Sequence, residues 1–172
     1  MNPALPEELT QKAKGIKLFV LDVDGVLTDG QIIINDEGVE SKNFNVRDGM
    51  ALSIARKKGF KIAIISGRYS KVVEHRASEL GIKEVHQGVS DKLIVFQEVL
   101  KNFDVTAEEA SFIGDDINDI PTMEACGFSA VPSDADETVK KKAEYVCSKP
   151  GGGGAVRELI EIILSSQHQW GL

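Results

Sequence analysis

The segment IKLFVLDVDG, residues 16–25, is an almost continuous apolar run that stops at two aspartates and a glycine. Such a run, rich in branched side chains and closed by Asp-Gly, predicts a strand buried on both faces and followed by a turn. KIAIIS (61–66) and ASFIG (110–114) have the same form, and polar residues follow each of them. We therefore expect at least three buried strands of the kind found in parallel sheets.

Segments with helical periodicity fill the intervals between these strands. They are residues 49–58, 69–80, 90–103, 117–125, 136–143 and 155–165, with further short strands expected at 85–86, 128–131 and 145–147. Strands that alternate with helices predict a parallel sheet covered by helices on both faces. We expect an α/β, Rossmann-like three-layer fold, in a single domain over residues 1–172.

One segment interrupts this alternation. QIIINDEGVESKNFNV, residues 31–46, has two extended pieces on either side of Asp36-Glu37-Gly38. Acidic residues followed by glycine favour a tight turn between strands. The pattern predicts a β-hairpin that projects from the end of the first strand.

The composition limits the classes of partner. The chain has 172 residues, 20 Lys and Arg against 27 Asp and Glu, and a net charge of −7. This charge disfavours nucleic acid and anionic membranes through Coulomb repulsion, so a small ligand is expected. The N-terminal residues lack the pattern of a secretory signal, no apolar run is long enough to span a bilayer, and Cys126 and Cys147 form no zinc or disulfide pattern. A cytoplasmic location is expected.

Polar residues follow each of the predicted strands. They are Asp22 and Asp24 after the first strand, Ser66, Gly67 and Arg68 after the second, Lys92 after a further short strand, and Asp115, Asp116 and Asp119 after the third. Each group alone is typical of a helix cap, a turn or a solvated surface. Because the carboxyl ends of parallel strands meet at one edge of a sheet, together they predict a single pocket.

The predicted pocket holds more carboxylates than ammonium groups. Clustered carboxylates repel one another and take up protons unless a cation is present, and oxygen ligands suit Mg²⁺. A phosphate ester beside that ion would meet a carboxylate able to attack it, a second able to protonate the leaving group, and Ser66 and Lys92 to hold its oxygens. The pattern indicates phosphoryl transfer to an aspartate.

The residues of this pocket resemble the haloacid dehalogenase superfamily of phosphatases. The similar motifs are DVDGV (22–26), Ser66 in ISGR, Lys92 in SDK and GDDINDIP (114–121). The resemblance implies that Asp22 is the nucleophile and that Asp24 is the general acid and base, with its backbone carbonyl reaching the metal. It also implies that Ser66 and Lys92 bind the phosphoryl group, and that Asp22, Asp24 and Asp115 hold Mg²⁺. It assigns Asp116 and Asp119 no individual role.

The spacing of the motifs leaves no room for the cap domain that many members of the superfamily carry. Asp24 to Ser66 can hold only the hairpin and one helix, and Ser66 to Lys92 only a helix and a short strand. A capless site leaves a reactive acyl phosphate open to water. We therefore expect a neighbouring subunit to cover the site.

Among capless members, the chain is similar to the phosphatases of 3-deoxy-D-manno-octulosonate 8-phosphate, an eight-carbon sugar acid phosphate used in lipopolysaccharide synthesis. The similar stretches, beyond the general motifs, are LDVDGVLTDG (21–30), FNVRDGM (44–50), HQG (86–88) and GGGGAVRE (151–158). The resemblance implies a homotetramer in which hairpins and C-terminal segments complete neighbouring sites.

Two arginines could bind the carboxylate of such a sugar. Arg47 and Arg68 offer the planar fork that pairs with carboxylates, although each could equally form an ordinary ion pair. Gly153 stands where the family usually has a basic residue, so one contact is absent or is supplied by Arg157 or Arg68. The glycine-rich segment and helix at 150–172 are either a simple hinge or a tail that closes over the substrate.

Two alternatives remain open. A nine-carbon sialic-acid-type 9-phosphate would need the same chemistry and nearly the same motifs. A non-catalytic, phosphatase-like oligomerisation module would have no need for the full set of Asp22, Asp24, Lys92 and Asp115, all of which are present.

Overall fold

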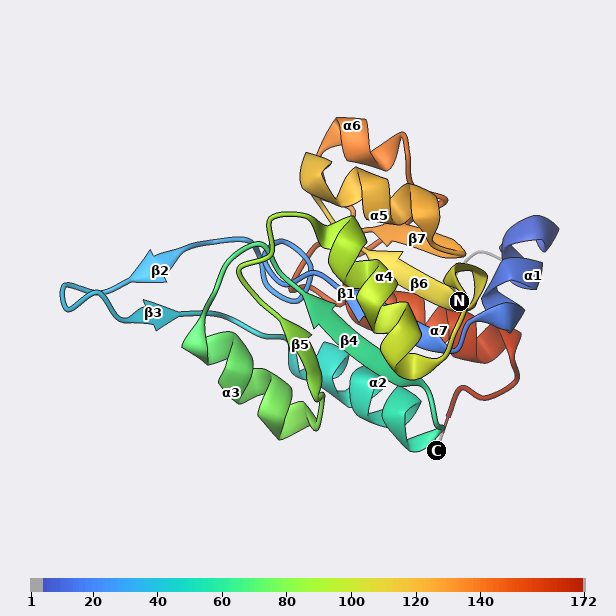
Figure 1. Ribbon diagram of the computed structural model, residues 1–172, viewed down its shortest axis with the longest axis horizontal. Coiled ribbons are helices and arrows are strands. Elements are labelled where there is room, and N and C mark those ends of the chain that lie inside the picture. The colour runs from blue at the N-terminus through green and yellow to red at the C-terminus, as the bar shows by residue number, and fades with distance from the viewer. Residues whose placement is uncertain (1–4, 172) are drawn as a thin grey trace.

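The central sheet has six parallel strands. A computed structural model describes residues 5–171 and gives the strand order β5-β4-β1-β6-β7-β8 (Figure 1). The strands are β1 (Leu18–Leu21), β4 (Lys61–Ile65), β5 (Glu84–His86), β6 (Ala110–Ile113), β7 (Phe128–Val131) and β8 (Tyr145–Val146). The expected parallel sheet is confirmed, and β1, which carries the segment that decides the fold, lies between β4 and β6.

Helices cover both faces of the sheet, so the three-layer arrangement is also confirmed. They are α1 (Glu7–Gly15), α2 (Val46–Lys57), α3 (Lys71–Leu80), α4 (Lys92–Phe103), α5 (Ile120–Ala125), α6 (Glu137–Lys140) and α7 (Ala155–Ser166), with the 3₁₀ turns η1 (Ala107–Glu109) and η2 (Ile117–Asp119). Buried residues of α1, α2, α3 and α7 belong to one core cluster, and those of α4, α5 and α6 to the other. Among residues 5–171, no helix is long and apolar enough to cross a membrane.

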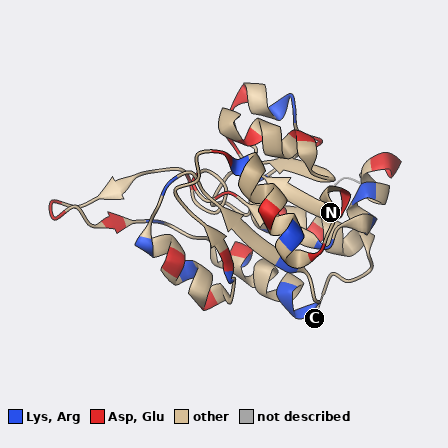
Figure 2. Ribbon diagram, viewed as in Figure 1, with Lys and Arg blue, Asp and Glu red and all other residues tan. Residues whose placement is uncertain are grey.

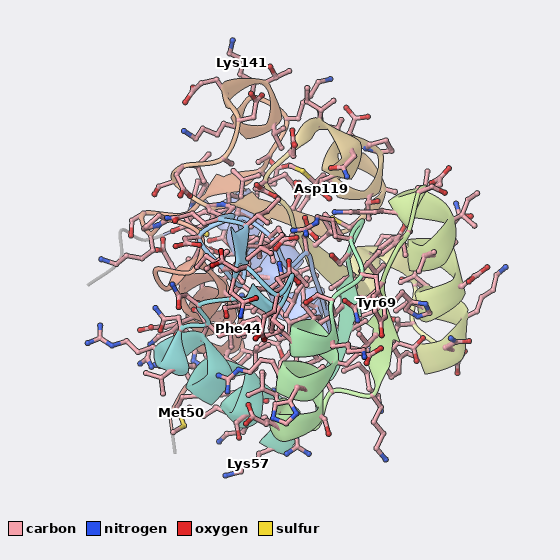
Figure 3. The ribbon with its side chains drawn as sticks, turned by 90° about the vertical axis from the view of Figure 1, so that its left-hand side faces the viewer. Phe44, Met50, Lys57, Tyr69, Asp119 and Lys141 are labelled. Atoms are coloured by element: carbon pink, nitrogen blue, oxygen red, sulfur yellow. The ribbon has the colours of Figure 1, made fainter. Side chains whose placement is uncertain are left out.

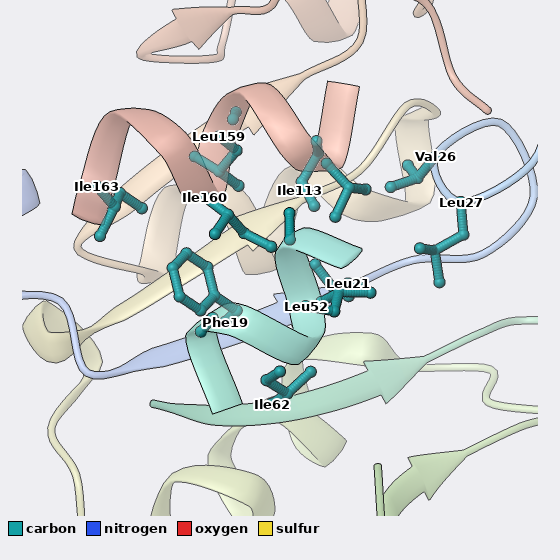
Figure 4. Packing of buried hydrophobic residues seen from close by; sticks show 14 of the residues in the cluster. Phe19, Leu21, Val26, Leu27, Leu52, Ile62, Ile113, Leu159, Ile160 and Ile163 are labelled. Atoms are coloured by element: carbon teal, nitrogen blue, oxygen red, sulfur yellow. The ribbon is translucent and has the colours of Figure 1, made fainter. Parts of the chain in front are cut away.

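Successive residues of β1 supply the two cores in turn. Phe19 and Leu21 pack with α2 and α7, whereas Leu18 and Val20 pack with α4 and α5. Figure 4 shows the first of these layers, in which Phe19 lies close to Ile160 of α7. The alternation of side chains along a strand explains why all four positions of β1 must be apolar.

The hairpin is present between β1 and α2. Its strands β2 (Ile33–Ile34) and β3 (Glu40–Ser41) pair in antiparallel register, and the Asn35 side chain accepts hydrogen bonds from the backbone of the turn. It extends from the side toward which the arrowheads of β4, β6 and β7 point (Figure 1). Acidic residues lie at its tip and in β3 (Figure 2).

The sequence analysis did not predict the helix α1. Among its own residues only Ala13 is buried, so the helix carries almost no apolar stripe to reveal it. Its end is held instead by polar contacts, because the Gln167 side chain donates hydrogen bonds to the carbonyl oxygens of Ala13 and Ile16 at 3.0 and 2.8 Å.

The C-terminal segment is part of the core. Eight of the residues of α7 are buried, and a Cβ atom added to Gly151 would lie 1.9 Å from the carbonyl oxygen of Gly25. The amide of Gly152 donates to the carbonyl of Val26 at 3.0 Å. Residues 150–166 are therefore packed against the loop that follows β1, and closure of this segment over a substrate stays a prediction.

Candidate active site

A cleft of about 270 Å³ lies at the carboxyl ends of the central strands. Its lining comprises Asp22, Asp24, Gly30, Ser66, Gly67, Arg68, Lys92, Asp115, Asp116 and Asn118. Figure 3 faces this edge of the sheet, with the hairpin toward the viewer and Asp119 labelled. Nearly every residue that the sequence assigned to the pocket is brought together here, from four strand ends.

Lys92 is buried between two carboxylates. Its Nζ lies 2.8 Å from Oδ2 of Asp22 and 2.6 Å from Oδ1 of Asp119, and its side chain is 2% exposed. Asp91 caps α4 by accepting hydrogen bonds from the next turn, which fixes Lys92 as the first residue of the helix. Burial alone lowers the pKa of the ammonium, but Asp22 and Asp119 outweigh it and raise that pKa, so Lys92 is charged.

Asp119 holds the loop after β6 in shape. While Oδ1 pairs with Lys92, Oδ2 accepts hydrogen bonds from the amides of Asp115 and Asp116 at 2.9 and 3.2 Å. Asp116 completes a capping box with Asp119 around η2. Asp119 is fully buried and both of its oxygens are engaged, so it orients Lys92 and the backbone of Asp115 and Asp116.

Three carboxylates of the site lie close enough together to hold a divalent cation. Oxygens of Asp22, Asp115 and Asp119 lie within 4.8 Å of one another. Burial, followed by the charge of Asp22, raises the pKa of Asp115 to about 8, and burial likewise raises the pKa of Asp22 to about 6. One lysine thus leaves the cluster short of positive charge, and hard oxygen donors in this number suit Mg²⁺.

The side chain of Asp24 points to a different set of partners. Its Oδ1 pairs with Nζ of Lys42, and its Oδ2 lies 3.6 Å from the Arg68 guanidinium. Arg68 also donates a hydrogen bond to Glu40 of β3 at 3.0 Å. The Asp24 carboxylate is therefore held beside the base of the hairpin, outside the cluster around Lys92.

Arg47 does not line the catalytic cleft within one chain. It belongs to a separate cleft with Lys149, Gly153 and Arg157, because it lies in the first turn of α2 and that turn contacts the start of α7. A contact between Arg47 and the substrate stays a prediction, since Arg47 lies outside the catalytic cleft of the single chain. Of the two residues proposed to replace a basic group at position 153, only Arg68 reaches the catalytic cleft.

Comparison of the sequence with known proteins shows the family to which the chain belongs. The model of the haloacid dehalogenase-like hydrolases matches residues 42–127. The 3-deoxy-D-manno-octulosonate 8-phosphate phosphatase KdsC of Salmonella typhimurium is 43% identical over 166 residues, which cover 96% of this chain and 88% of the relative. The chain belongs to the haloacid dehalogenase-like hydrolases.

Solved structures of similar proteins match this hydrolase over nearly its whole length. The phosphatase of the same name from Yersinia pestis has a TM-score of 0.95 and 41% identity, covering 96% of this chain and 89% of that one. The protein from Moraxella catarrhalis, solved with magnesium, phosphate and KDO, has a TM-score of 0.93 and 43% identity, covering 95% and 94%.

Two residues of the site escaped the sequence-based expectation. Asn118 lines the cleft, and Lys42 pairs with Asp24. Asn118 stands inside GDDINDIP, so the motif itself was a signal for it. Asp119 was expected in the pocket without a role of its own, and the structure shows that it pairs with Lys92. Lys42 had no signal, because only the tertiary contact between the hairpin and the loop after β1 brings it to Asp24.

Gly25 is expected to be essential for this hydrolase to bind Mg²⁺. A Cβ atom added there would lie 2.0 Å from Oδ2 of Asp115, so Gly25→Ala displaces that carboxylate. We expect the affinity for Mg²⁺, measured by isothermal titration calorimetry, to fall about 10- to 100-fold. Gly59→Ala is the control, since Gly59 also has a positive φ but meets no atom within 4 Å. Equal losses in both variants would assign the effect to backbone strain.

Proposed function

We propose that this hydrolase removes the phosphate of 3-deoxy-D-manno-octulosonate 8-phosphate and releases the free sugar acid, a step in making the lipopolysaccharide precursor. The observation that carries the chemistry is the Asp22 carboxylate, fixed by the buried ammonium of Lys92 at the end of β1. The similarity to KdsC phosphatases over most of the chain supports the substrate. It is supported further by the Moraxella catarrhalis relative, whose structure contains magnesium, phosphate and KDO.

In the proposed first step, an oxygen of Asp22 attacks the phosphorus and the bond to the sugar oxygen breaks. Asp24 gives its proton to that oxygen, so the sugar acid leaves as an alcohol. Ser66, Gly67 and Lys92 hold the oxygens of the transferring group, because hydrogen-bond donors and a fixed ammonium stabilise the charge that develops there. The product of this step is an aspartyl phosphate on Asp22.

In the proposed second step, Asp24 takes a proton from water, and the water oxygen attacks the phosphorus. The bond to Asp22 breaks, phosphate is released and both carboxyl groups return to their starting states. The carboxylates of Asp22 and Asp115 and the backbone carbonyl of Asp24 would hold Mg²⁺, which supplies positive charge against the phosphate oxygens. The Asp119 side chain is left to support Lys92, since both of its oxygens already have partners.

Arg68 is the residue we assign to the sugar carboxylate. It lines the cleft and its side chain is 43% exposed, so its guanidinium can turn from Glu40 toward a bound acid. A bidentate pair with a carboxylate would replace a long contact to Asp24.

The proposed function is tested by phosphate release in the presence of Mg²⁺. The substrates are 3-deoxy-D-manno-octulosonate 8-phosphate, a sialic acid 9-phosphate and p-nitrophenyl phosphate. We expect kcat/KM to be highest for the first by at least about tenfold, since a missing charged or hydrogen-bonded contact costs on this order. Equal, slow rates on all three would reject the substrate, and no release from any would favour the non-catalytic module.

We also propose that four copies of the chain assemble and that neighbouring hairpins cover the active sites. Ile32, Ile34 and Val39 of the hairpin are each more than half exposed in a single chain. Apolar side chains gathered on a projecting element favour contact with another protein surface. The two free cysteines, Cys126 and Cys147, are compatible with the proposed location in the reducing cytoplasm.

The assembly is expected to depend on the hairpin. Introducing two charges with Ile32→Asp and Ile34→Asp places them on the proposed interface, so the protein should dissociate from a tetramer to a monomer. Light scattering after size-exclusion chromatography measures the mass. Val146→Asp, at an exposed apolar residue of β8, is the control and is expected to stay a tetramer. A hairpin variant that keeps the mass of four chains would contradict the proposal.

A further inference from the structure

Lys42 is a buried lysine outside the family motifs. Its side chain is 1% exposed, although lysine is among the residues least often buried. The residue follows β3, at the point where the hairpin returns to the body of the protein. Its Nζ pairs with Oδ1 of Asp24 and lies 3.4 Å from Oε1 of Glu40.

The charges around Lys42 form a closed set. Arg68 contacts the same two carboxylates, with one nitrogen 3.6 Å from Asp24 and another 3.0 Å from Glu40. Two cations and two anions therefore alternate between the hairpin and the carboxyl end of β1. Burying an ammonium is costly unless it is paired, so Lys42 is held at this point by its two carboxylates.

The two cations differ in how firmly they hold Asp24. Lys42 is almost entirely buried and contacts Oδ1 directly, whereas Arg68 is 43% exposed and lies farther from Oδ2. If Arg68 turns to a substrate, Oδ2 loses its partner and faces the cleft, while Oδ1 stays bound to Lys42. The geometry thus divides the carboxyl group into an anchored oxygen and a free one.

We propose that Lys42 is a positioning residue that anchors Oδ1 of Asp24, so that Oδ2 can exchange a proton with the leaving oxygen and later with water. Glu40 of β3 also contacts Lys42, so the position of the hairpin affects the position of the Asp24 carboxyl group. The inference rests on the proposed function, because it assumes that Asp24 is the general acid and base. It assigns the hairpin a part in the chemistry in addition to assembly.

A purely structural role makes a different prediction. If Lys42 only ties the hairpin to the body of the protein, its removal affects both phosphates alike, or acts on the sugar carboxylate through Glu40 and Arg68 and adds to the loss of Asp24→Asn. If it positions the acid, removal affects only substrates whose leaving group needs a proton. An alkyl phosphate needs one, whereas p-nitrophenyl phosphate releases a stable phenolate without it. The ratio of the two rates, taken together with a double mutant at Asp24, separates the two roles.

The test compares kcat/KM for the sugar-acid 8-phosphate and for p-nitrophenyl phosphate, because this parameter counts only the steps through departure of the alcohol. For Lys42→Met we expect a loss of about 10- to 100-fold on the alkyl phosphate, part of what a general acid contributes. The loss on the aryl phosphate is expected to stay within about threefold. Glu40→Gln keeps the lysine and is expected to show a smaller loss with the same selectivity. If Lys42→Met fails to fold, the substrate selectivity of Glu40→Gln tests the same proposal.

A double-mutant cycle connects Lys42 to Asp24. In an Asp24→Asn background, Lys42→Met is expected to cause no further loss on the alkyl phosphate, since the group on which it acts is already gone. Lys142→Met is the control, because Lys142 forms a surface pair with Glu124 at 3.0 Å. It should leave both rates unchanged.

Two results would overturn the inference while leaving the proposed function in place. One is an equal loss on both substrates, and the other is a loss that adds to that of Asp24→Asn. A wild type that hydrolyses neither phosphate would reject the proposed function and this inference with it. A wild type that hydrolyses only the aryl phosphate would reject the sugar-acid substrate. Any alkyl phosphate that the wild type does turn over then serves in the same comparison.

Discussion

The Asp22→Asn variant is expected to lose phosphate release by at least about 10⁴-fold while remaining folded. The amide has the shape of the carboxylate but is neutral, so its oxygen is too weak a nucleophile to attack phosphorus. The fold is expected to survive, because Lys92 keeps its contact with Asp119 at 2.6 Å. Burial raises the pKa of Asp22 to about 6 although the charge of Lys92 opposes it, and the same burial favours a neutral side chain at this position.

The measurement is phosphate release from both the sugar-acid phosphate and p-nitrophenyl phosphate, together with urea denaturation. Hydrolysis of p-nitrophenyl phosphate does not need a general acid, but it still needs the nucleophile. The rates on the two substrates should therefore fall together. Asp116→Asn is the matched control, since Asp116 lines the same cleft but is exposed and caps η2. Substantial turnover by Asp22→Asn would reject Asp22 as the attacking group.

The Asp119→Ala variant is expected to lower the free energy of unfolding by about 3–5 kcal/mol, as removal of one partner of a buried ion pair does. Lys92 would lose one of its two carboxylates, and the amides of Asp115 and Asp116 would lose their acceptor. An unpaired buried donor carries its own desolvation cost. This loss is a large fraction of the total stability of an ordinary domain, about 5–15 kcal/mol.

Urea denaturation without Mg²⁺ measures the effect, so that a change in metal affinity does not contribute. Asp116→Ala is again the control, because its side chain is exposed and its loss removes only the cap of η2. We expect it to cost about 1 kcal/mol. If the two variants were equally stable, Asp119 would not be the support of the loop after β6.

The sequence predicted the sheet well because its central strands are buried on both faces. The four residues of β1 are all apolar, and such runs have few alternatives to a central parallel strand. The hairpin was visible for a different reason, since Asp36-Glu37-Gly38 requires a turn. The helix α1 was missed because only Ala13 among its residues is buried. Its other contacts with the body of the protein are made by the partly buried Leu9 and by polar groups such as the amide of Gln167.

The candidate site was predictable to the extent that it follows the strand ends. Asp22, Ser66, Lys92 and Asp115 are all found in one cleft, as the topology of a parallel sheet requires. The sequence could not show that Arg47 lines a separate cleft of the single chain, because the direction of a helical side chain depends on how α2 packs against α7. The residues around Lys42 are those of a solvent-exposed hairpin, and no local pattern indicates that the ammonium of Lys42 is buried.

The packing of Gly151 and Gly152 also determines when the protein can become active during its translation. They press against the loop from Gly25 to Asp29, so α7 supports the loop that follows β1. A growing chain on the ribosome therefore holds the nucleophile early but lacks the support of its loop until α7 has emerged. Ribosome-bound chains that stop before Pro150 are expected to be inactive, and activity should appear only once α7 can dock.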